Sequence, residues 1–302
     1  MLRLSAWAAL AAAGLCAQDQ RDAPSFRADV RLVTVLATVK DARGAVVGGL
    51  EREDFTVMAA GAPQRIAVFE RQTDRPLSVV MLFDSSPSVT KERRFEQDSA
   101  LRFLRSLLSK GANPADRAAV YAFSSHVDQV QGFTASLARL EKAVLGIQPA
   151  AGTSVYDALY LAAHSLERRE GRRVIVVITD GEDTTSDIDF AQAQEACQRA
   201  DVVLYGVVVV PVTVDAGRNL RGENALKAMS AATGGMAFVQ HQGSDLDESF
   251  RRIERELRTQ YLLGFYPRGL PASSERFRRI EVQVKPAGAR ALARSGYYES
   301  AH

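Results

Sequence analysis

Long apolar runs alternate with amphipathic stretches through the middle of the chain. The runs are rich in Val, Ile and Leu and are bounded by polar residues, which is typical of strands buried on both faces of a parallel sheet. We predict strands over Leu77–Phe83, Arg117–Ser124, Gln129–Phe133, Val174–Thr179, Val202–Val210 and Met236–Gln240. We predict helices over Glu92–Leu108, Leu137–Leu145, Val155–Arg168, Phe190–Ala200, Asn224–Ala232 and Leu246–Gln260. This alternation predicts an α/β fold, with helices on both faces of a mostly parallel sheet.

The segment before this region has a different pattern, with a period of two residues, and both faces of its first strand are partly apolar. That period is typical of short antiparallel strands separated by turns. We predict four such strands, over Val30–Thr38, Ala45–Leu50, Asp54–Met58 and Gln64–Glu70. Four short strands suggest a small antiparallel β-sandwich, but they are few for an independent core.

The end of the chain supplies further strands, predicted over Tyr261–Tyr266, Arg279–Lys285 and Ala293–Tyr298. We expect them to complete the N-terminal sandwich, so that the α/β domain is inserted between its two halves. The alternative is a separate flexible tail, in which unpaired apolar strands would expose edges that favour aggregation. The predicted organisation is an N-terminal β segment over 18–74, the α/β domain over 75–260 and a C-terminal β segment over 261–302.

Small oxygen-bearing side chains stand where the apolar runs end. Asp84, Ser86 and Ser88 follow the first run, Asp180 ends a later one, and Thr153 lies between them in the sequence. Ligands of open α/β sheets bind beyond the carboxyl ends of the strands. Two carboxylates and three hydroxyls, without thiol or imidazole, suit Mg²⁺, Mn²⁺ or Ca²⁺ better than zinc.

Each of these residues also has an ordinary explanation. An Asp that closes a strand commonly caps the next helix, and Ser86 and Ser88 alone would be turn residues. The combination, in this order and at the ends of these elements, favours a metal site formed by all five residues.

The motif Asp-x-Ser-x-Ser, a later Gly-Thr loop and a strand-terminal Thr-Asp-Gly together resemble the von Willebrand factor type A domain and its metal-ion-dependent adhesion site. The resemblance covers roughly Arg75 to Gln260. It implies a doubly wound, six-stranded sheet that binds a divalent cation, and a partner protein whose Asp or Glu fills an open position on the metal. Pro87, between the two serines, departs from the pattern and fixes φ there. The whole chain also resembles von Willebrand A-related proteins of acidobacteria.

Composition excludes some classes of partner. The 302 residues carry 38 basic and 36 acidic side chains, a net charge of +2, which gives no nucleic-acid footprint. After the N-terminus, no segment approaches the roughly 18 consecutive apolar residues of a membrane span.

The first 17 residues have one positive charge, an apolar core and a small residue at Ala17, which predicts a secretory signal peptide cleaved there. We therefore expect a secreted or periplasmic protein. Lipid attachment at Cys16 is the alternative, although Leu15 is a poor residue before a lipoprotein cysteine. After cleavage Cys197 is the one cysteine left, so the mature chain has no intramolecular disulfide.

No motif for catalysis is present. The four histidines are scattered, and Ser85 lacks the Gly-x-Ser-x-Gly turn of a hydrolase nucleophile. We expect a non-enzymatic binding module that engages a protein partner through its cation. Two alternatives stay open, a hydrolase that uses a metal-bound water and a structural protein in which the metal only braces the sheet.

Other acidic residues near the predicted site have two interpretations. Asp157 is either an outer-shell carboxylate or the start of a helix. Asp183, Asp187 and Asp189 form an acidic rim after Asp180, which is either a solvated loop or a second cation site.

Overall fold

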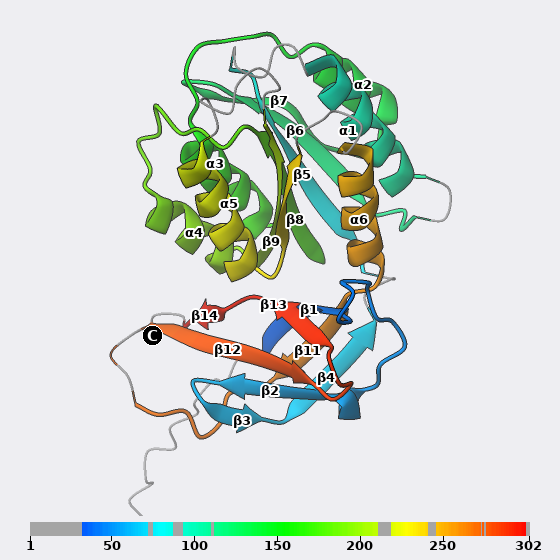
Figure 1. Ribbon diagram of the computed structural model, residues 1–302, viewed down its shortest axis with the longest axis vertical. Coiled ribbons are helices and arrows are strands. Elements are labelled where there is room, and N and C mark those ends of the chain that lie inside the picture. The colour runs from blue at the N-terminus through cyan, green and yellow to red at the C-terminus, as the bar shows by residue number, and fades with distance from the viewer. Residues whose placement is uncertain are drawn as a thin grey trace, which may run out of the picture. The chain divides into compact units, whose positions relative to one another are not determined.

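A six-stranded sheet forms the centre of the α/β domain, with the strand order β10-β9-β8-β5-β6-β7 (Figure 1). Its strands are β5 Leu77–Asp84, β6 Arg117–Phe123, β7 Val127–Thr134, β8 Arg172–Thr179, β9 Val202–Val209 and β10 Met236–Gln240. Neighbouring strands are parallel except β6 and β7. The short loop between those two strands allows only a hairpin, because a parallel pair needs a long crossover.

The computed structural model describes residues 32–71, 75–86, 93–109, 112–210, 219–240, 246–272, 274 and 276–299. The predicted signal peptide, the possible lipid anchor at Cys16 and the predicted ligand Ser88 lie outside these residues. The described residues all belong to one compact unit. Among the described helices, none combines the length and apolarity that a membrane crossing requires.

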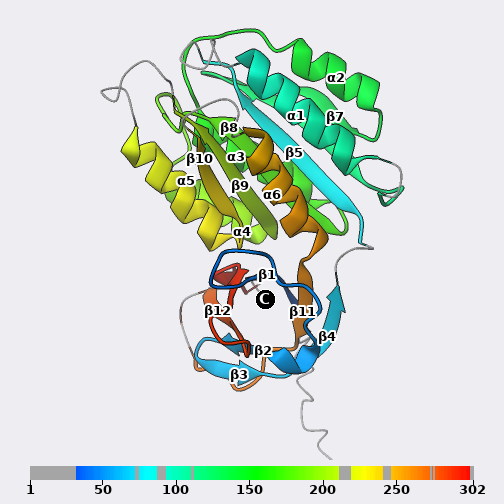
Figure 2. The same ribbon diagram turned by 45° about the vertical axis from the view of Figure 1, so that its right-hand side comes forward.

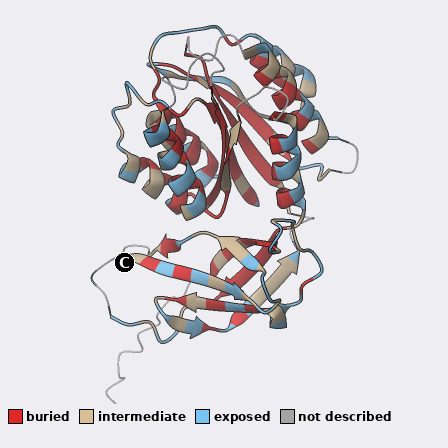
Figure 3. Cartoon of the chain, viewed as in Figure 1, coloured by how far each residue is buried: buried red, intermediate tan, exposed pale blue. Residues whose placement is uncertain are grey.

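Helices cover both faces of the central sheet. One face carries α1 Arg93–Leu107, α2 Leu137–Leu145 and α6 Leu246–Arg258, and the other carries α3 Val155–Glu167, α4 Phe190–Arg199 and α5 Leu220–Ala232. Successive β5 side chains alternate between the two cores: Val79 and Met81 belong to the first, and Val80 and Leu82 to the second. All eight β5 residues are buried (Figure 3). The apolar runs are thus strands buried on both faces, as predicted.

The N- and C-terminal segments together form two antiparallel sheets, with the orders β13-β1-β11-β4 and β14-β12-β2-β3 (Figure 2). Their strands are β1 Val33–Lys40, β2 Phe55–Ala59, β3 Ala62–Gln64, β4 Ile66–Arg71, β11 Tyr261–Phe265, β12 Phe277–Val284, β13 Arg290–Ala293 and β14 Gly296–Tyr298. Val35 and Leu263 of one sheet share a hydrophobic cluster with Val57 and Ile280 of the other. The predicted fold class is confirmed: an α/β sheet with an antiparallel β-sandwich built from both ends of the chain.

The chain leaves the sandwich after one strand and returns to it in the neighbouring strand of the same sheet. β4 precedes the α/β domain, β11 follows it, and these two strands pair with each other, Arg71 opposite Tyr261. The α/β domain is therefore inserted between two neighbouring strands of one sheet.

Polar contacts fix the sandwich to the α/β domain. Lys40 at the end of β1 forms an ion pair with Glu256 of α6, with 2.5 Å between Nζ and Oε1 and side chains 3% and 2% exposed. Arg294, after β13, pairs with Asp201, after α4, at 2.7 Å. The contacted residues lie at the C-terminal ends of the helices, and hence at the edge of the sheet opposite the carboxyl ends of its parallel strands.

Four elements differ from the sequence prediction. The strand predicted over Gln64–Glu70 is divided between β3 and β4, which lie in different sheets, and the one predicted over Ala293–Tyr298 is divided between β13 and β14. The strand predicted over Ala45–Leu50 is wrong: the segment makes one isolated bridge, from Val46 to Lys40, and Gly49 has a φ of 81°, which is not strand backbone. Helix α5 begins at Leu220 rather than at the predicted Asn224, because the side chain of Asn219 accepts a hydrogen bond from the Gly222 amide and caps it.

Candidate functional site

The two predicted carboxylates lie at the ends of neighbouring strands. In the β5–β8 pair, Phe83 is opposite Ile178, so Asp84 is level with Thr179 and Asp180 follows directly. The Thr179 hydroxyl donates to Asp84 Oδ2 at 2.6 Å. The prediction that Asp84 and Asp180 end adjacent central strands is confirmed.

Asp84 is a buried carboxylate, 4% exposed. Burial, with a smaller contribution from the charge of Asp180, raises its pKa to about 6, although hydrogen bonds from Thr179 and Ser86 act in the opposite direction. None of the described ion pairs includes Asp84, and no cationic side chain of the described residues is among the groups that shift its pKa. At neutral pH this site therefore holds a buried negative charge beside a second carboxylate.

Ser86 lies directly beside Asp84. Its amide donates to Asp84 Oδ1 at 2.8 Å, and its hydroxyl also hydrogen-bonds that carboxylate. The preceding residue anchors the loop, because the amide and the hydroxyl of Ser85 both donate to the carbonyl of Phe123, at 2.8 and 2.9 Å. The end of β6 thus supports the turn that carries two of the predicted ligands.

The loop that carries Thr153 joins the two strand ends. The Thr153 amide donates to the Thr184 hydroxyl at 3.0 Å, and the Thr184 amide returns a bond to the Thr153 carbonyl at 2.8 Å. On the other side, the Ala150 amide donates to the Ser85 carbonyl at 2.9 Å. Thr153 is 4% exposed, and within the described part of the chain its hydroxyl makes no hydrogen bond.

The turn after Asp180 is shaped by helix α5. Asp180 Oδ1 accepts the Glu182 amide at 3.0 Å, and Gly181 has a φ of 87°. A Cβ on Gly222 would lie 1.7 Å from the Gly181 carbonyl oxygen. Only glycine at both positions allows this backbone contact, which holds the first turn of α5 against the site.

The acidic residues beyond Asp180 have structural roles. Asp183 Oδ1 accepts the Val155 amide at 2.8 Å at the start of α3, and Asp189 caps α4 through the Gln192 amide at 2.8 Å. Asp157, within α3, accepts the Ile188 amide at 2.9 Å. Among the described residues, no group of three or more His, Cys, Asp or Glu side chains is arranged to hold a metal. The second cation site in this rim stays a prediction.

Two residues of the site were not identified from the sequence. Thr179 bonds Asp84 directly, and its signal was available: it precedes Asp180 on the strand beside β5. Arg93 of α1 donates to the carbonyls of Ser85 and Ser86. No local pattern marks Arg93, because the contact depends on how α1 lies across the loop.

The four described candidate ligands come from three loops that hydrogen bonds tie into one group. They supply carboxylate and hydroxyl oxygens only, which are donors for Mg²⁺, Mn²⁺ or Ca²⁺. The uncompensated burial of Asp84 is the observation that fits a cation at this place.

Comparisons with known proteins agree on the fold. A minor pilin, the D319A mutant of PilB from Streptococcus sanguinis, has a TM-score of 0.51 and 14% identity, over 62% of this chain and 62% of its own. A von Willebrand factor type A protein from Catenulispora acidiphila has a TM-score of 0.50 and 13% identity, over 91% of this chain and 76% of its own. The pilus adhesin SpaC from Lactobacillus rhamnosus GG has a TM-score of 0.51 and 8% identity, over 83% and 48%.

These identities show a shared fold and no more, and the chain spans less than two thirds of the PilB structure. No curated protein matches the chain in sequence. The von Willebrand factor type A domain family matches residues 78–252, more than half of the 302 residues. The chain therefore belongs to the von Willebrand factor type A domain family.

Proposed function

We propose that this protein is a non-enzymatic binding module that engages a partner protein through a divalent cation. Asp84, Ser86, Ser88, Thr153 and Asp180 would hold the cation, as Mg²⁺, Mn²⁺ or Ca²⁺. The observation that carries the proposal is Asp84, a buried carboxylate beside a second carboxylate, which forms no ion pair with a cationic side chain among the described residues. A buried charge without a counter-charge costs several kcal/mol, and a bound cation would offset that cost.

The partner is proposed to supply an Asp or Glu side chain. Mg²⁺ held by one or two carboxylates usually keeps further positions for water or another ligand, and a carboxylate is a fitting oxygen donor. Two structures that share the fold are described as a minor pilin and a pilus adhesin, which supports a binding role. The predicted signal peptide over residues 1–17 supports a secreted or periplasmic location.

The direct test is calorimetry with Mg²⁺ and Mn²⁺ on the wild-type protein and on Asp84→Ala. We expect Asp84→Ala to abolish metal binding and leave the fold intact, because Asp84 is the last residue of β5 and belongs to neither apolar core of the sheet. Ser86→Ala and Thr153→Ala should weaken metal binding less, since a neutral hydroxyl contributes less than a carboxylate. Asp187→Ala is the matched control, an exposed carboxylate in a nearby loop.

Partner binding is tested by capture from the native envelope fraction, with and without EDTA. Capture should require the cation, disappear in Asp84→Ala and be competed by free carboxylates at high concentration. Equal metal binding by wild type and Asp84→Ala, or capture unchanged in EDTA, would refute the proposal. Metal-dependent turnover of an ester or phosphate that is lost in Asp84→Ala would favour the hydrolase instead.

A further inference from the structure

Arg93, the first residue of α1, reaches back to the loop that carries the candidate ligands. Its Nη2 donates to the carbonyl oxygens of both Ser85 and Ser86, at 3.0 and 3.2 Å. Its Nε and Nη1 are buried and have no hydrogen-bond partner in the described part of the chain. The hydrogen bonds of this guanidinium in the described part of the chain therefore go to two successive backbone carbonyls.

These two bonds orient the backbone that presents Ser86. When consecutive carbonyls both point to one nitrogen, the peptide between them has little freedom to rotate. The Ser85 carbonyl also accepts the Ala150 amide at 2.9 Å, and the Ser86 amide is directed at Asp84 Oδ1 at 2.8 Å. A change at Arg93 would thus release the segment that aligns a hydroxyl and a carboxylate of the site.

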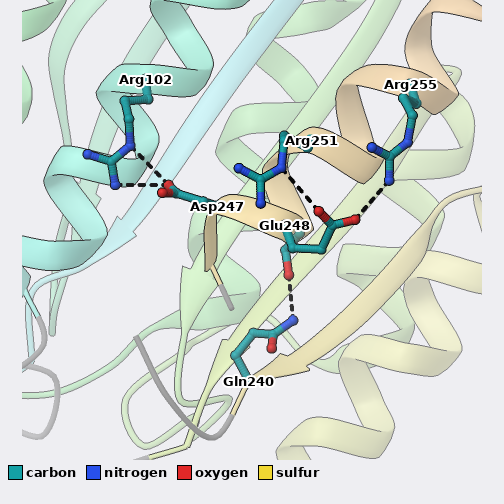
Figure 4. A network of polar contacts seen from close by, with 7 residues as sticks. Arg102, Gln240, Asp247, Glu248, Arg251 and Arg255 are labelled. Atoms are coloured by element: carbon teal, nitrogen blue, oxygen red, sulfur yellow. Dashed lines mark hydrogen bonds and ion pairs between the residues drawn. The ribbon is translucent and has the colours of Figure 1, made fainter. Parts of the chain in front are cut away.

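Helix α1 gives Arg93 a support that does not depend on the loop. Arg102 of α1 pairs with Asp247 of α6 at 2.9 Å, as Figure 4 shows. Phe103 stacks on Phe250, with ring centroids 5.2 Å apart. These contacts fix the second half of α1 to α6, and the helix backbone connects that half to Arg93.

We propose that Arg93 is a positioning residue of the metal site, which holds the Asp84–Ser86 loop in its ligating arrangement without touching the cation. The inference rests on the proposed function. The two consequences of losing Arg93 have opposite signs. A cationic side chain repels a nearby metal ion, so loss of the Arg93 charge alone would raise the metal affinity. If positioning dominates, loss of Arg93 lowers the affinity.

The experiment compares Arg93→Met, Arg93→Lys and a matched control, Arg94→Met. Arg94 is 84% exposed, and in the described part of the chain its charged partner is Asp98, at 3.8 Å, in the next turn. The first measurement is titration with Mn²⁺ alone. Loss of groups that orient metal ligands typically costs about 10- to 100-fold in affinity. We expect a loss of that size for Arg93→Met, a smaller one for Arg93→Lys, and none for Arg94→Met.

The second measurement is amide hydrogen exchange at Ser85 and Ser86 in EDTA, which needs no metal. Exchange at these amides should be faster in Arg93→Met than in wild type and Arg94→Met, while exchange in the β5 core stays the same. If the wild-type protein binds no Mn²⁺, the proposed function fails, and the exchange rates still decide whether Arg93 holds the loop. Unchanged exchange, or Mn²⁺ affinity equal to or above wild type in Arg93→Met, overturns the inference.

Discussion

The buried ion pair between Lys40 and Glu256 gives the sharpest stability prediction. Both side chains are almost fully buried, 3% and 2% exposed, and they join the sandwich to α6 of the α/β domain. In Lys40→Met a side chain of similar length keeps the packing, but the Glu256 carboxylate stays buried without its cation. Removal of one partner of a buried pair costs about 3–5 kcal/mol, a large part of the roughly 5–15 kcal/mol that stabilises a typical domain.

Urea unfolding measures this cost in the wild type, Lys40→Met, Glu256→Leu and the double variant. The double variant should recover most of the lost stability, because apolar replacement of a whole buried pair is often neutral or favourable, and the cycle gives the coupling energy. Arg105→Met is the control. It breaks an exposed pair with Glu141, 50% and 42% exposed, and should cost less than about 1 kcal/mol. A Lys40→Met cost no larger than that of Arg105→Met would refute the reasoning, as would a double variant no more stable than either single variant.

Two further predictions follow from close packing. Gly222→Ala places a Cβ 1.7 Å from the Gly181 carbonyl oxygen, so it should lower the thermal unfolding midpoint and weaken Mn²⁺ binding. In the control Gly48→Ala, the new Cβ has no atom within 4 Å, so neither quantity should change. Equal unfolding midpoints in the two variants would contradict this prediction. Burial raises the pKa of the Cys197 thiol to about 12. Iodoacetamide at pH 8 should therefore leave Cys197 unlabelled in the folded protein and label it fully in urea, as measured by mass spectrometry. Labelling of the folded protein at the rate of a free thiol would contradict this prediction.

The fold was largely predictable because burial on both faces leaves a direct mark in the sequence. The long apolar runs within β5 and β8 predicted central strands, and Asp84 and Asp180 marked their ends. The start of α5 was not predictable in the same way. Gly222 is a poor helix former, and its reason for being there, the contact with Gly181, lies across the fold.

The same limit applies to the supporting residues of the site and to the domain contacts. Arg93 acts on backbone carbonyls, which every residue has, so no side-chain pattern identifies its target. The alternation of β1 showed two partly apolar faces, and the structure divides them: Val35 faces the sandwich core, whereas Leu36 packs against the core of the α/β domain. An alternating sequence pattern shows that both faces of a strand are partly apolar. It does not show which part of the fold packs against each face.

The pairing of β4 with β11 has a mechanical consequence. Since Arg71 lies opposite Tyr261, the two ends of the inserted domain are clamped side by side by a ladder of backbone hydrogen bonds. A pull on the α/β domain divides between two covalent connections, one into β5 and one out of α6. The α/β domain therefore cannot be stretched between its own two ends until β4 and β11 have separated.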